Sequence, residues 1–419
     1  MDPETSLKKL FSLHTFGIKL GFENIVGFLN HLGNPQKEVK TIHIAGSNGK
    51  GSTASFISSI LQEFGYKVGL YTSPHFVKFN ERVVINGKQI DDDYIANFIS
   101  NHENYIDEHQ LTFFEVTTAM AFQYFREMKP DYCVIETGLG GRLDATNVLD
   151  PLAVVITSIS LEHTNVLGNS IEQIAFEKVE IIKRNSKVFT GILVSEAMDV
   201  VINKCKETQS EIFKIENYIS NDLNNIRLST DDSVLPLNPP LRGNYQKKNA
   251  ALAALCVSKT FQLQDEQNYL NGISNVCLNT GLQGRFEYFH KSPDIIFDSA
   301  HNPEGIENFL AEFNTNLYSY NNKSVLFGAM RDKSIADMLK MLANTFDDLY
   351  ISQIQYERAA SLEEISVECQ KLNINCNQVK KPAEFIINFK TSPDNECLVV
   401  LGSMYLLGEI KQVLSGSTA

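Results

Sequence analysis

A glycine-rich segment in the first part of the chain has the composition of a phosphate-binding loop. It reads AGSNGKGS from Ala45 to Ser52 and lies between an apolar stretch and an amphipathic one. Three glycines let the backbone turn tightly, so that several N–H groups and a helix N-terminus can face one phosphate, and Lys50 adds a positive charge. The standard P-loop pattern is not met, because its first glycine would fall at Ile44 and Gly51 separates Lys50 from Ser52. We predict phosphate binding here, with a flexible turn and a solvated lysine as the alternative.

An acidic residue ends the next apolar strand, in the segment ETGLGGRLDATN from Glu136 to Asn147. A parallel sheet presents its ligand-facing residues at this end of its strands, and a carboxylate beside a phosphate loop is a natural Mg²⁺ ligand. An acid that caps a turn or forms a salt bridge is the alternative. The pattern alone does not separate these two interpretations.

A histidine and a lysine further along the chain are candidates for the same site. His163 follows a strand that ends near Ile159 and has the chemistry of a ligand or a base, although a single loop histidine is more often merely exposed or hydrogen-bonded. Lys178 lies on a predicted helix that opens with the capping-box spacing of Ser170 and Gln173, and the apolar periodicity places it on the buried face. A buried lysine must be paired or chemically modified, unless its stem snorkels and leaves the ammonium in solvent.

A further polar group, DSAHNP from Asp298 to Pro303, follows a strand and precedes a helix late in the chain. Asp298 and His301 there have the chemistry to bind a ribose, an amino acid or a cation. The alternative is an Asx-type turn that leads into a helix with Pro303 at its first position.

Alternating strands and helices place these candidate residues. A strand at residues 41–45, a helix from about 52 to 64 and a strand at 67–71 predict one βαβ unit. A helix near residues 114–128 and strands at 132–135 and 152–159 predict a second. This alternation predicts an α/β fold with a P-loop-type, doubly wound and mostly parallel sheet.

A second series of strands and helices begins after residue 290. The predicted strands are 295–298, 324–327, 348–351 and 397–401, and the predicted helices are 303–313, 334–343, 361–372 and 382–390. We therefore expect two domains, residues 1–290 and a smaller α/β domain at 291–419. The polar, proline-containing segment 216–243 reads as surface connections around short elements.

Composition excludes several classes of function. The chain has 419 residues and a formal net charge of −13, which argues against a nucleic-acid partner because phosphate neutralisation needs clustered Lys and Arg. The seven cysteines are scattered without metal-finger spacing and read as buried thiols of a reducing compartment. Because no apolar run approaches the roughly 20 residues that span a bilayer, we expect a cytoplasmic protein with no membrane partner.

Taken together, these segments resemble the folylpolyglutamate synthase/dihydrofolate synthase family, relatives of the Mur peptidoglycan ligases, over nearly the whole chain. The blocks that carry the resemblance are LGNP at 32–35, HIAGSNGKGS at 43–52, YTSPH at 71–75, NER at 80–82, FFE at 113–115, the 136–147 and 298–303 segments, and Gly402 with Ser403. Ser47 stands where the family has Thr, and Glu162 where it has Asp. The resemblance implies an N-terminal ATPase domain and a Rossmann-like C-terminal domain. It also implies catalysis with ATP and two Mg²⁺ ions.

The resemblance also implies roles for individual residues. The nucleotide contacts it implies are Gly46, Ser47, Asn48, Gly49, Lys50, Gly51, Ser52, Asn249, Arg285 and Asp298. The implied metal ligands are Ser73, Glu136, His163 and Lys178, the last as a carbamate. The implied catalytic residues are Lys50, His163 and Lys178. The implied substrate contacts are Thr72, Pro74, His75, Arg82, Phe114, Glu115, His301 and Ser403.

The activity implied is ligation of L-glutamate to a folate-type carboxylate through an acyl phosphate. The acceptor is dihydropteroate, a reduced folate, or both; a monovalent cation is a further candidate cofactor, and we expect a monomer. Three alternatives remain: a Mur-type ligase of a peptidoglycan precursor, a non-catalytic nucleotide-binding paralogue, and a P-loop kinase that would make a phosphoester and no amide. Retention of Lys50, Glu136, His163 and Lys178 together argues against the non-catalytic paralogue.

Overall fold

The computed structural model describes residues 2–13, 21–220, 226–229, 234–315 and 320–416, which divide into two compact units. The larger unit comprises Met1–Pro74, Asn80–Pro240 and Gln246–Gly281. The smaller unit comprises Leu282–Ala419 together with two short upstream segments, His75–Phe79 and Leu241–Tyr245. This division falls earlier in the chain than the boundary expected between residues 290 and 291, and sequence patterns gave no sign of the two upstream segments.

The larger unit is built on an eight-stranded sheet in the order β4-β3-β2-β5-β1-β6-β7-β8. All neighbouring strands are parallel except for the β2–β3 and β3–β4 pairs. A separate antiparallel pair, β9 and β10, lies outside this sheet. The strands are β1 (Thr41–Ala45), β2 (Val68–Tyr71), β3 (Val83–Ile85), β4 (Lys88–Gln89), β5 (Tyr132–Glu136), β6 (Ala153–Ile156), β7 (Lys187–Thr190), β8 (Glu211–Lys214), β9 (Arg227–Ser229) and β10 (Val234–Pro236).

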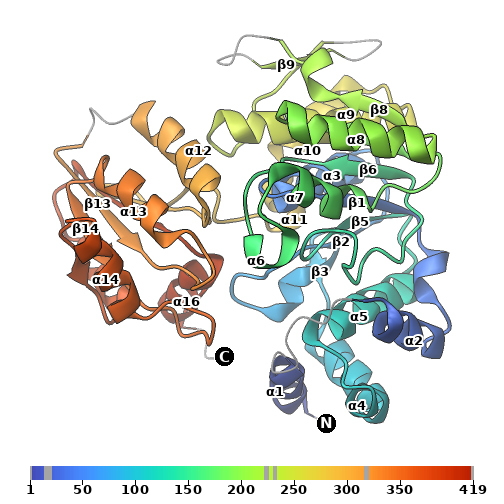
Figure 1. Ribbon diagram of the computed structural model, residues 1–419, viewed down its shortest axis with the longest axis horizontal. Helices are drawn as coiled ribbons and strands as arrows, with labels where there is room; N and C mark the ends of the chain where they lie inside the picture. Colours follow the sequence, from blue (N-terminus) through green and yellow to red (C-terminus); the bar gives the residue numbers. More distant parts are fainter. Residues whose placement is uncertain (1, 14–20, 221–225, 230–233, 316–319, 417–419) are drawn as a thin grey trace. The chain divides into compact units, whose positions relative to one another are not determined.

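Helices cover this sheet. In Figure 1, α1, α2, α4 and α5 lie together, while α7 and α8 pack over β6 and β7 through one apolar cluster. The helices are α1 (Pro3–Ser12), α2 (Glu23–His31), α3 (Lys50–Glu63), α4 (Asp92–Glu108), α5 (Phe113–Met128), α6 (Thr164–Leu167), α7 (Ile171–Val179), α8 (Ser195–Thr208), α9 (Asn244–Phe261), α10 (Glu266–Ser274) and α11 (Val276–Thr280).

The register of the central strands brings the candidate residues to one edge of the sheet. Strand β1 is buried along its whole length, as expected for a central parallel strand covered on both faces. Ile44 of β1 pairs with Glu136 of β5, and Tyr71 of β2 pairs with Ile135. The loops that leave β1, β2 and β5 therefore start at the same level and at the same carboxyl edge.

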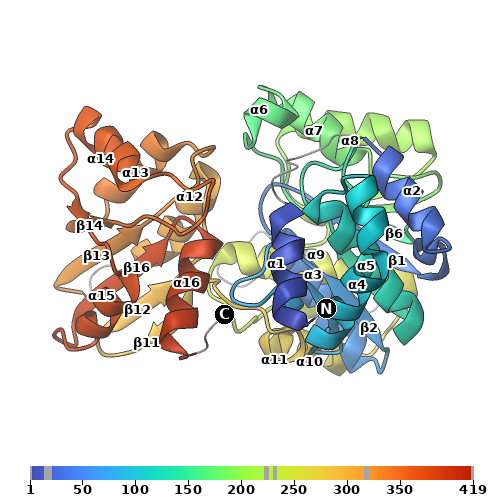
Figure 2. The same cartoon turned by 90° about the horizontal axis from the view of Figure 1, so that it is seen from below.

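The smaller unit has a six-stranded sheet in the order β11-β12-β16-β13-β14-β15, parallel except for β11. Figure 2 shows this sheet between α12, α13 and α14 on one face and α15 and α16 on the other. The elements are β11 (Glu287–His290), β12 (Asp294–Phe297), β13 (Asn322–Phe327), β14 (Asp348–Ile351), β15 (Asn377–Gln378), β16 (Glu396–Leu401), α12 (Pro303–Phe313), α13 (Ile335–Ala343), α14 (Leu362–Lys371), α15 (Pro382–Phe389) and α16 (Met404–Leu414).

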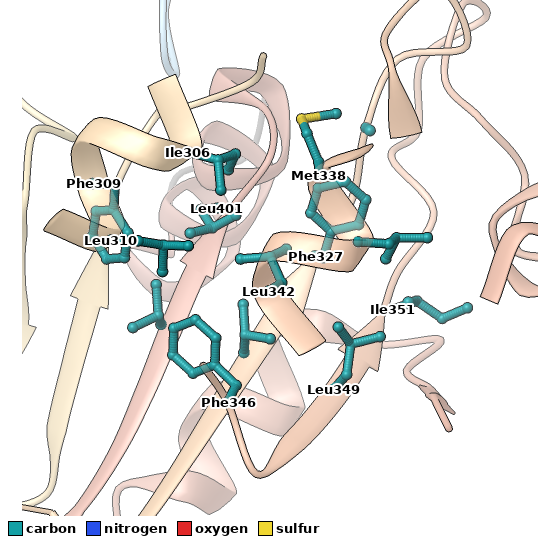
Figure 3. Close-up of a cluster of buried hydrophobic side chains, with 14 of the residues drawn as sticks. Ile306, Phe309, Leu310, Phe327, Met338, Leu342, Phe346, Leu349, Ile351 and Leu401 are labelled. Atoms are coloured by element: carbon teal, nitrogen blue, oxygen red, sulfur yellow. The ribbon is translucent and has the colours of Figure 1, made fainter. Parts of the chain in front are cut away.

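Each face of this second sheet has its own apolar core. Figure 3 shows the cluster under α12 and α13, where Phe309, Phe327 and Leu342 interdigitate. The cluster on the opposite face includes Phe297, Leu406 and Ile410. Alternate residues of each strand point to opposite faces, so both cores come from the same short apolar runs.

The predicted fold class, two α/β units with mostly parallel sheets, is confirmed. Strands β1 and β14 and helix α12 have the predicted bounds. The strand expected at 152–159 ends at Ile156, and the residues after it form a loop that returns to the glycine-rich segment.

Candidate active site

The glycine-rich segment forms a tight loop between β1 and α3. Gly49 precedes α3 in the left-handed region, at φ 84°, and a Cβ there would lie 2.7 Å from the Asn249 side-chain oxygen. A Cβ on Gly46 would lie 1.9 Å from Thr157 Oγ1. Both positions therefore require glycine, and the side chain of Asn249 of α9 lies directly against the loop.

The segment after β6 fastens this loop. The amide of Ser47 donates to the carbonyl of Ser158 at 2.8 Å, and the amide of Asn48 donates to Ser158 Oγ at 2.9 Å. The Thr157 hydroxyl donates to the carbonyl of Asn48 at 2.6 Å. Sequence reasoning missed Thr157 and Ser158, although a polar run directly after a buried parallel strand is a usable signal.

Two lysine ammonium groups converge on one carbonyl oxygen at the start of the loop. Lys50 Nζ donates to Gly46 O at 2.8 Å, and Lys178 Nζ donates to the same oxygen at 2.9 Å. Lys178 Nζ also lies 2.7 Å from Glu162 Oε1, in a pair whose side chains are only 2% and 5% exposed. Lys178 is thus on the buried face of α7, as predicted, and it is paired rather than snorkelled.

The electrostatics of Glu162 follow from this pairing. Burial by itself raises the pKa of the Glu162 carboxyl, but the neighbouring Lys178 and Lys50 ammonium groups outweigh it and hold the pKa well below its usual value. The loop therefore holds two cations and one buried anion, an excess of positive charge that suits a phosphate. Glu162, noted in the sequence only as a departure from a family pattern, is the counter-ion of Lys178.

Glu136 is the second acid of the site. Its carboxylate accepts a hydrogen bond from the backbone amide of Ser73 at 3.1 Å, so these two predicted metal residues lie together. The Phe114 ring fills the space beside Gly138, where a Cβ would lie 2.4 Å from its tip. Glu115, expected to contact substrate, instead closes the capping box of α5 by accepting from the Thr112 amide and hydroxyl. Its carboxylate is therefore engaged in holding the helix start.

The site offers oxygen atoms that can hold a divalent cation. In the part of the chain that the structure describes, no group of three or more His, Cys, Asp or Glu side chains is arranged as a metal cluster. Glu136 offers a carboxylate oxygen, and Ser52 Oγ is buried without a hydrogen-bond partner among the described residues, which suits a ligand such as Mg²⁺ or a phosphate. His163 lies at the start of α6 with φ 47°. Lys178 lies 2.7 Å from Glu162 in an ion pair here.

A buried relay orients the loop that follows Glu136. Asp144 accepts hydrogen bonds from the amides of Gly138 and Leu139 at 2.9 and 2.8 Å, and from the Thr146 hydroxyl at 2.5 Å. His43 Nε2 lies 2.8 Å from the same hydroxyl. Since the Thr146 proton goes to Asp144, His43 donates through Nε2. Its Nδ1 is buried without a hydrogen-bond partner among the described residues, which suits the neutral imidazole. Sequence reasoning did not single out His43, which lies in the buried strand β1.

This relay predicts a specific pH dependence of stability. Burial, with a smaller contribution from Lys183, lowers the pKa of His43 from 6.5 to about 3 in the folded protein. A lowered histidine pKa stabilises the fold above pH 6.5, and this contribution is lost as the pH falls towards 3. We expect chemical denaturation between pH 7 and 5 to show wild type losing about 2 kcal/mol more of its unfolding free energy than His43→Gln. Parallel curves would contradict the relay, and His109→Gln, at an exposed position, is the matched control.

The remaining expected substrate residues of the larger unit flank the end of β2. The Thr72 amide donates to the Arg82 carbonyl at 3.0 Å, which fixes the two ends of the segment 72–82 against each other. The Arg82 side chain is buried, with its guanidinium 5.1 Å from the Phe113 ring centre. Pro74 ends the first segment of the larger unit, and His75 begins the short segment that belongs to the smaller one.

The smaller unit gathers its own candidate residues at the carboxyl ends of β12 and β16. Asp298 is buried and accepts from the amides of Phe286 and Ala300 at 2.7 and 2.8 Å, while burial raises its pKa. Arg285 donates to the Ser299 hydroxyl. The two strand ends are joined by a hydrogen bond of 2.9 Å from the Gly402 amide to the Ala300 carbonyl. His301 Nδ1 lies 2.9 Å from the Ser299 carbonyl, and Ser403 caps α16 by accepting from Tyr405.

Comparison with known proteins defines the class. Residues 44–257 match the Mur ligase middle domain, and residues 284–404 match the Mur ligase, glutamate ligase domain. The first match ends before the break between residues 281 and 282, and the second begins after it. The chain is a member of the Mur ligase class of proteins.

Similar proteins within that class share one family name. The chain is 34% identical over 422 residues to the dihydrofolate synthase/folylpolyglutamate synthase of Bacillus subtilis, covering 95% of this chain and 96% of that protein. It superposes with a TM-score of 0.88 and 25% identity on the Mycobacterium tuberculosis folylpolyglutamate synthase complexed with ADP, over 98% of this chain and 99% of the other. It also superposes on E. coli FolC in complex with DHPP and ADP, with a TM-score of 0.87 and 28% sequence identity, over 99% of this chain and 98% of the other. The chain belongs to the dihydrofolate synthase/folylpolyglutamate synthase family.

Two further features concern the helices and the cysteines. No helix among the described residues is long and apolar enough to cross a membrane. None of the seven cysteines, all of which lie in the described residues, forms a disulfide, and five of them are buried. Burial raises the pKa of Cys256 to about 12, so its sulfur is held as an unreactive thiol.

Proposed function

We propose that this protein is an ATP-dependent ligase that joins L-glutamate to dihydropteroate and to reduced folates, forming dihydrofolate and folylpolyglutamates with ADP and phosphate. The observation that carries the proposal is the loop after β1. Lys50 and Lys178 meet at the Gly46 carbonyl there, and a buried hydroxyl of Ser52 has no partner among the described residues. Such a loop suits the phosphates of a nucleotide, and the family relatives that bind ADP support that assignment.

The reaction requires activation of a poor electrophile. A carboxylate oxygen of the folate-type acceptor attacks the γ-phosphorus of ATP, the bond to ADP breaks, and an acyl phosphate forms. The α-amine of glutamate then attacks the acyl carbon, loses a proton, and expels inorganic phosphate. Lys50 stabilises the charge on the transferring phosphoryl group, and loop amides together with the N-terminus of α3 hold the remaining phosphates.

We assign Mg²⁺ to the acid beside this loop. Glu136, held against the Ser73 amide, and the hydroxyl of Ser52 would hold the ion, which supplies charge neutralisation to the nucleotide phosphates when bound. His163 is a further ligand in this proposal. A second ion would require Lys178 as a carbamate, released from Glu162. The proposal further includes a monovalent cation as a cofactor, and a protein that is a monomer in the cytoplasm.

Substrate contacts divide between the units in the same proposal. Thr72, Pro74, His75, Arg82 and Phe114 border the acceptor, while His301 and Ser403 serve the glutamate, and Arg285 and Asp298 serve the nucleotide. The carboxylate of Glu115 is left out, because it closes the capping box of α5.

The test is incorporation of labelled glutamate with ATP and Mg²⁺, run in parallel with dihydropteroate and tetrahydrofolate as acceptors. We expect incorporation into both, with one ADP and one phosphate formed per amide bond. Incorporation into dihydropteroate alone would restrict the function to dihydrofolate synthesis. The proposal would be refuted if ATP turnover needed no folate-type acceptor. It would also be refuted if labelled glutamate were incorporated into neither dihydropteroate nor tetrahydrofolate.

A further inference from the structure

A short piece of the expected acceptor-binding segment is packed into the smaller unit. Residues 75–79 belong to that unit by their contacts, although Pro74 before them and Asn80 after them belong to the larger one. Phe76 makes the attachment, because its ring packs against the apolar cluster that contains Phe297 and Leu407. The segment is therefore joined by covalent bonds to one unit and by packing to the other.

Two glycines of the smaller unit make room for Phe76. A Cβ on Gly408, within α16, would lie 1.9 Å from the Phe76 carbonyl oxygen. A Cβ on Gly284 would lie 2.3 Å from the tip of the Phe76 ring, and Gly284 also has a φ of 63°. The backbone and the ring of Phe76 thus each occupy space that only a glycine leaves open.

A partly buried ion pair forms the rim of this socket. Lys411 Nζ lies 5.7 Å from the Phe76 ring centre and 5.9 Å from that of Phe297. The ammonium is held by Glu287 at 2.7 Å, and Glu287 also accepts from the Gly284 amide at 2.7 Å. The cation faces the Phe76 ring, and its carboxylate partner accepts a hydrogen bond from the glycine beside that ring, so the ion pair contacts two parts of the socket.

The elements that form the socket are the ones that carry the candidate residues of the smaller unit. Gly284 precedes Arg285, and α16 begins at the cap residue Ser403. On the other side, Ser73 lies three residues upstream of Phe76. We propose that Phe76 is a positioning residue, which holds His75 and the rest of the segment 75–79 against Gly284 and α16 of the smaller unit. This inference rests on the proposed ligase function.

Kinetics of Phe76 variants test the proposal. For Phe76→Ala we expect kcat/KM for the folate-type acceptor to fall about 10- to 100-fold, because small misplacements of reacting groups are costly, with the KM for ATP within about twofold of wild type. Phe76→Leu, which keeps an apolar side chain in the socket, recovers most of the loss. Gly408→Ala, which pushes a methyl group against the Phe76 carbonyl, reproduces it.

A matched control separates positioning from general destabilisation. Phe289 packs against the same cluster and stacks on Phe297 at 4.5 Å, but it lies on β11 and is not part of the segment 75–79. Phe289→Ala should lower the melting temperature and leave the acceptor KM unchanged. Equal effects of Phe76→Ala and Phe289→Ala on the acceptor kcat/KM would overturn the proposal.

Hydrogen exchange tests the attachment without any substrate. We expect peptides that cover residues 72–80 to exchange at least about tenfold faster in Phe76→Ala than in wild type. Should that variant fail to fold, Gly408→Ala carries the same measurement. Unchanged exchange would overturn the inference, whereas wild-type protein that ligates no glutamate but shows the faster exchange in the variant would refute the proposed function and leave the attachment standing.

Discussion

Replacing Lys50 by Met is expected to lower kcat for glutamate ligation about 10²- to 10³-fold, the usual effect of removing one charge-stabilising donor from a transition state. The Lys50 ammonium lies 2.8 Å from Gly46 O and 3.3 Å from Ser47 O, within the loop that we assign to the phosphates. Its loss removes a positive charge that stabilises the transferring phosphoryl group. The fold should tolerate the change, because Gly46 O keeps its hydrogen bond from Lys178.

The measurement is steady-state ligation together with a thermal melt of the same preparation. We expect a melting temperature within a few degrees of wild type, consistent with a change in unfolding free energy of roughly 0.5 kcal/mol or less. Lys50→Arg should recover little activity, since a planar guanidinium does not replace a compact ammonium in a tight loop. A kcat for Lys50→Met within a few-fold of wild type would show that the loop does not serve phosphoryl transfer.

Local patterns in the sequence were enough to predict most of the elements near the site. Helix α12 begins at Pro303 as predicted, since the Asn302 side chain caps it and proline is favoured at the first position. Helix α7 opens with the predicted hydrogen bond from the Gln173 amide to Ser170 Oγ. Helix α3 starts at Lys50 and not near residue 52, because Gly49 adopts the left-handed conformation that begins the helix directly after the loop.

Contacts between distant segments could not be predicted in the same way. The buried face of α7 showed that Lys178 needs a partner, but nothing in the local pattern identified Glu162, sixteen residues upstream. The attachment of residues 75–79 to the smaller unit depends on Gly284 and Gly408, which are far along the chain. The structural role of Glu115 is different, since the spacing of Thr112 and Glu115 is a capping-box pattern that was visible in the sequence.

Breaking the Glu162–Lys178 pair is expected to have the largest effect on stability. The pair joins side chains that are 5% and 2% exposed at 2.7 Å, so removing one partner leaves a buried charge without its counter-ion. Such a loss costs about 3–5 kcal/mol. We therefore expect Glu162→Gln and Lys178→Met each to lower the unfolding free energy by about that amount, and the double variant to recover most of the loss.

Urea denaturation of wild type, the two single variants and the double variant gives the coupling free energy between Glu162 and Lys178 directly. The exposed pair Lys8 and Glu4 of the same unit is the control. Lys8→Met should change the unfolding free energy by less than about 1 kcal/mol, because exposed pairs contribute little. A Glu162→Gln variant as stable as wild type, or more stable, would contradict an ammonium at position 178. That result would instead match a carbamate, since a carbamylated Lys178 and the Glu162 carboxylate are both anions and repel each other. Carbon-13 spectra of protein in labelled bicarbonate would then show the carbamate directly, and the second metal ion of the proposed site would regain its ligand.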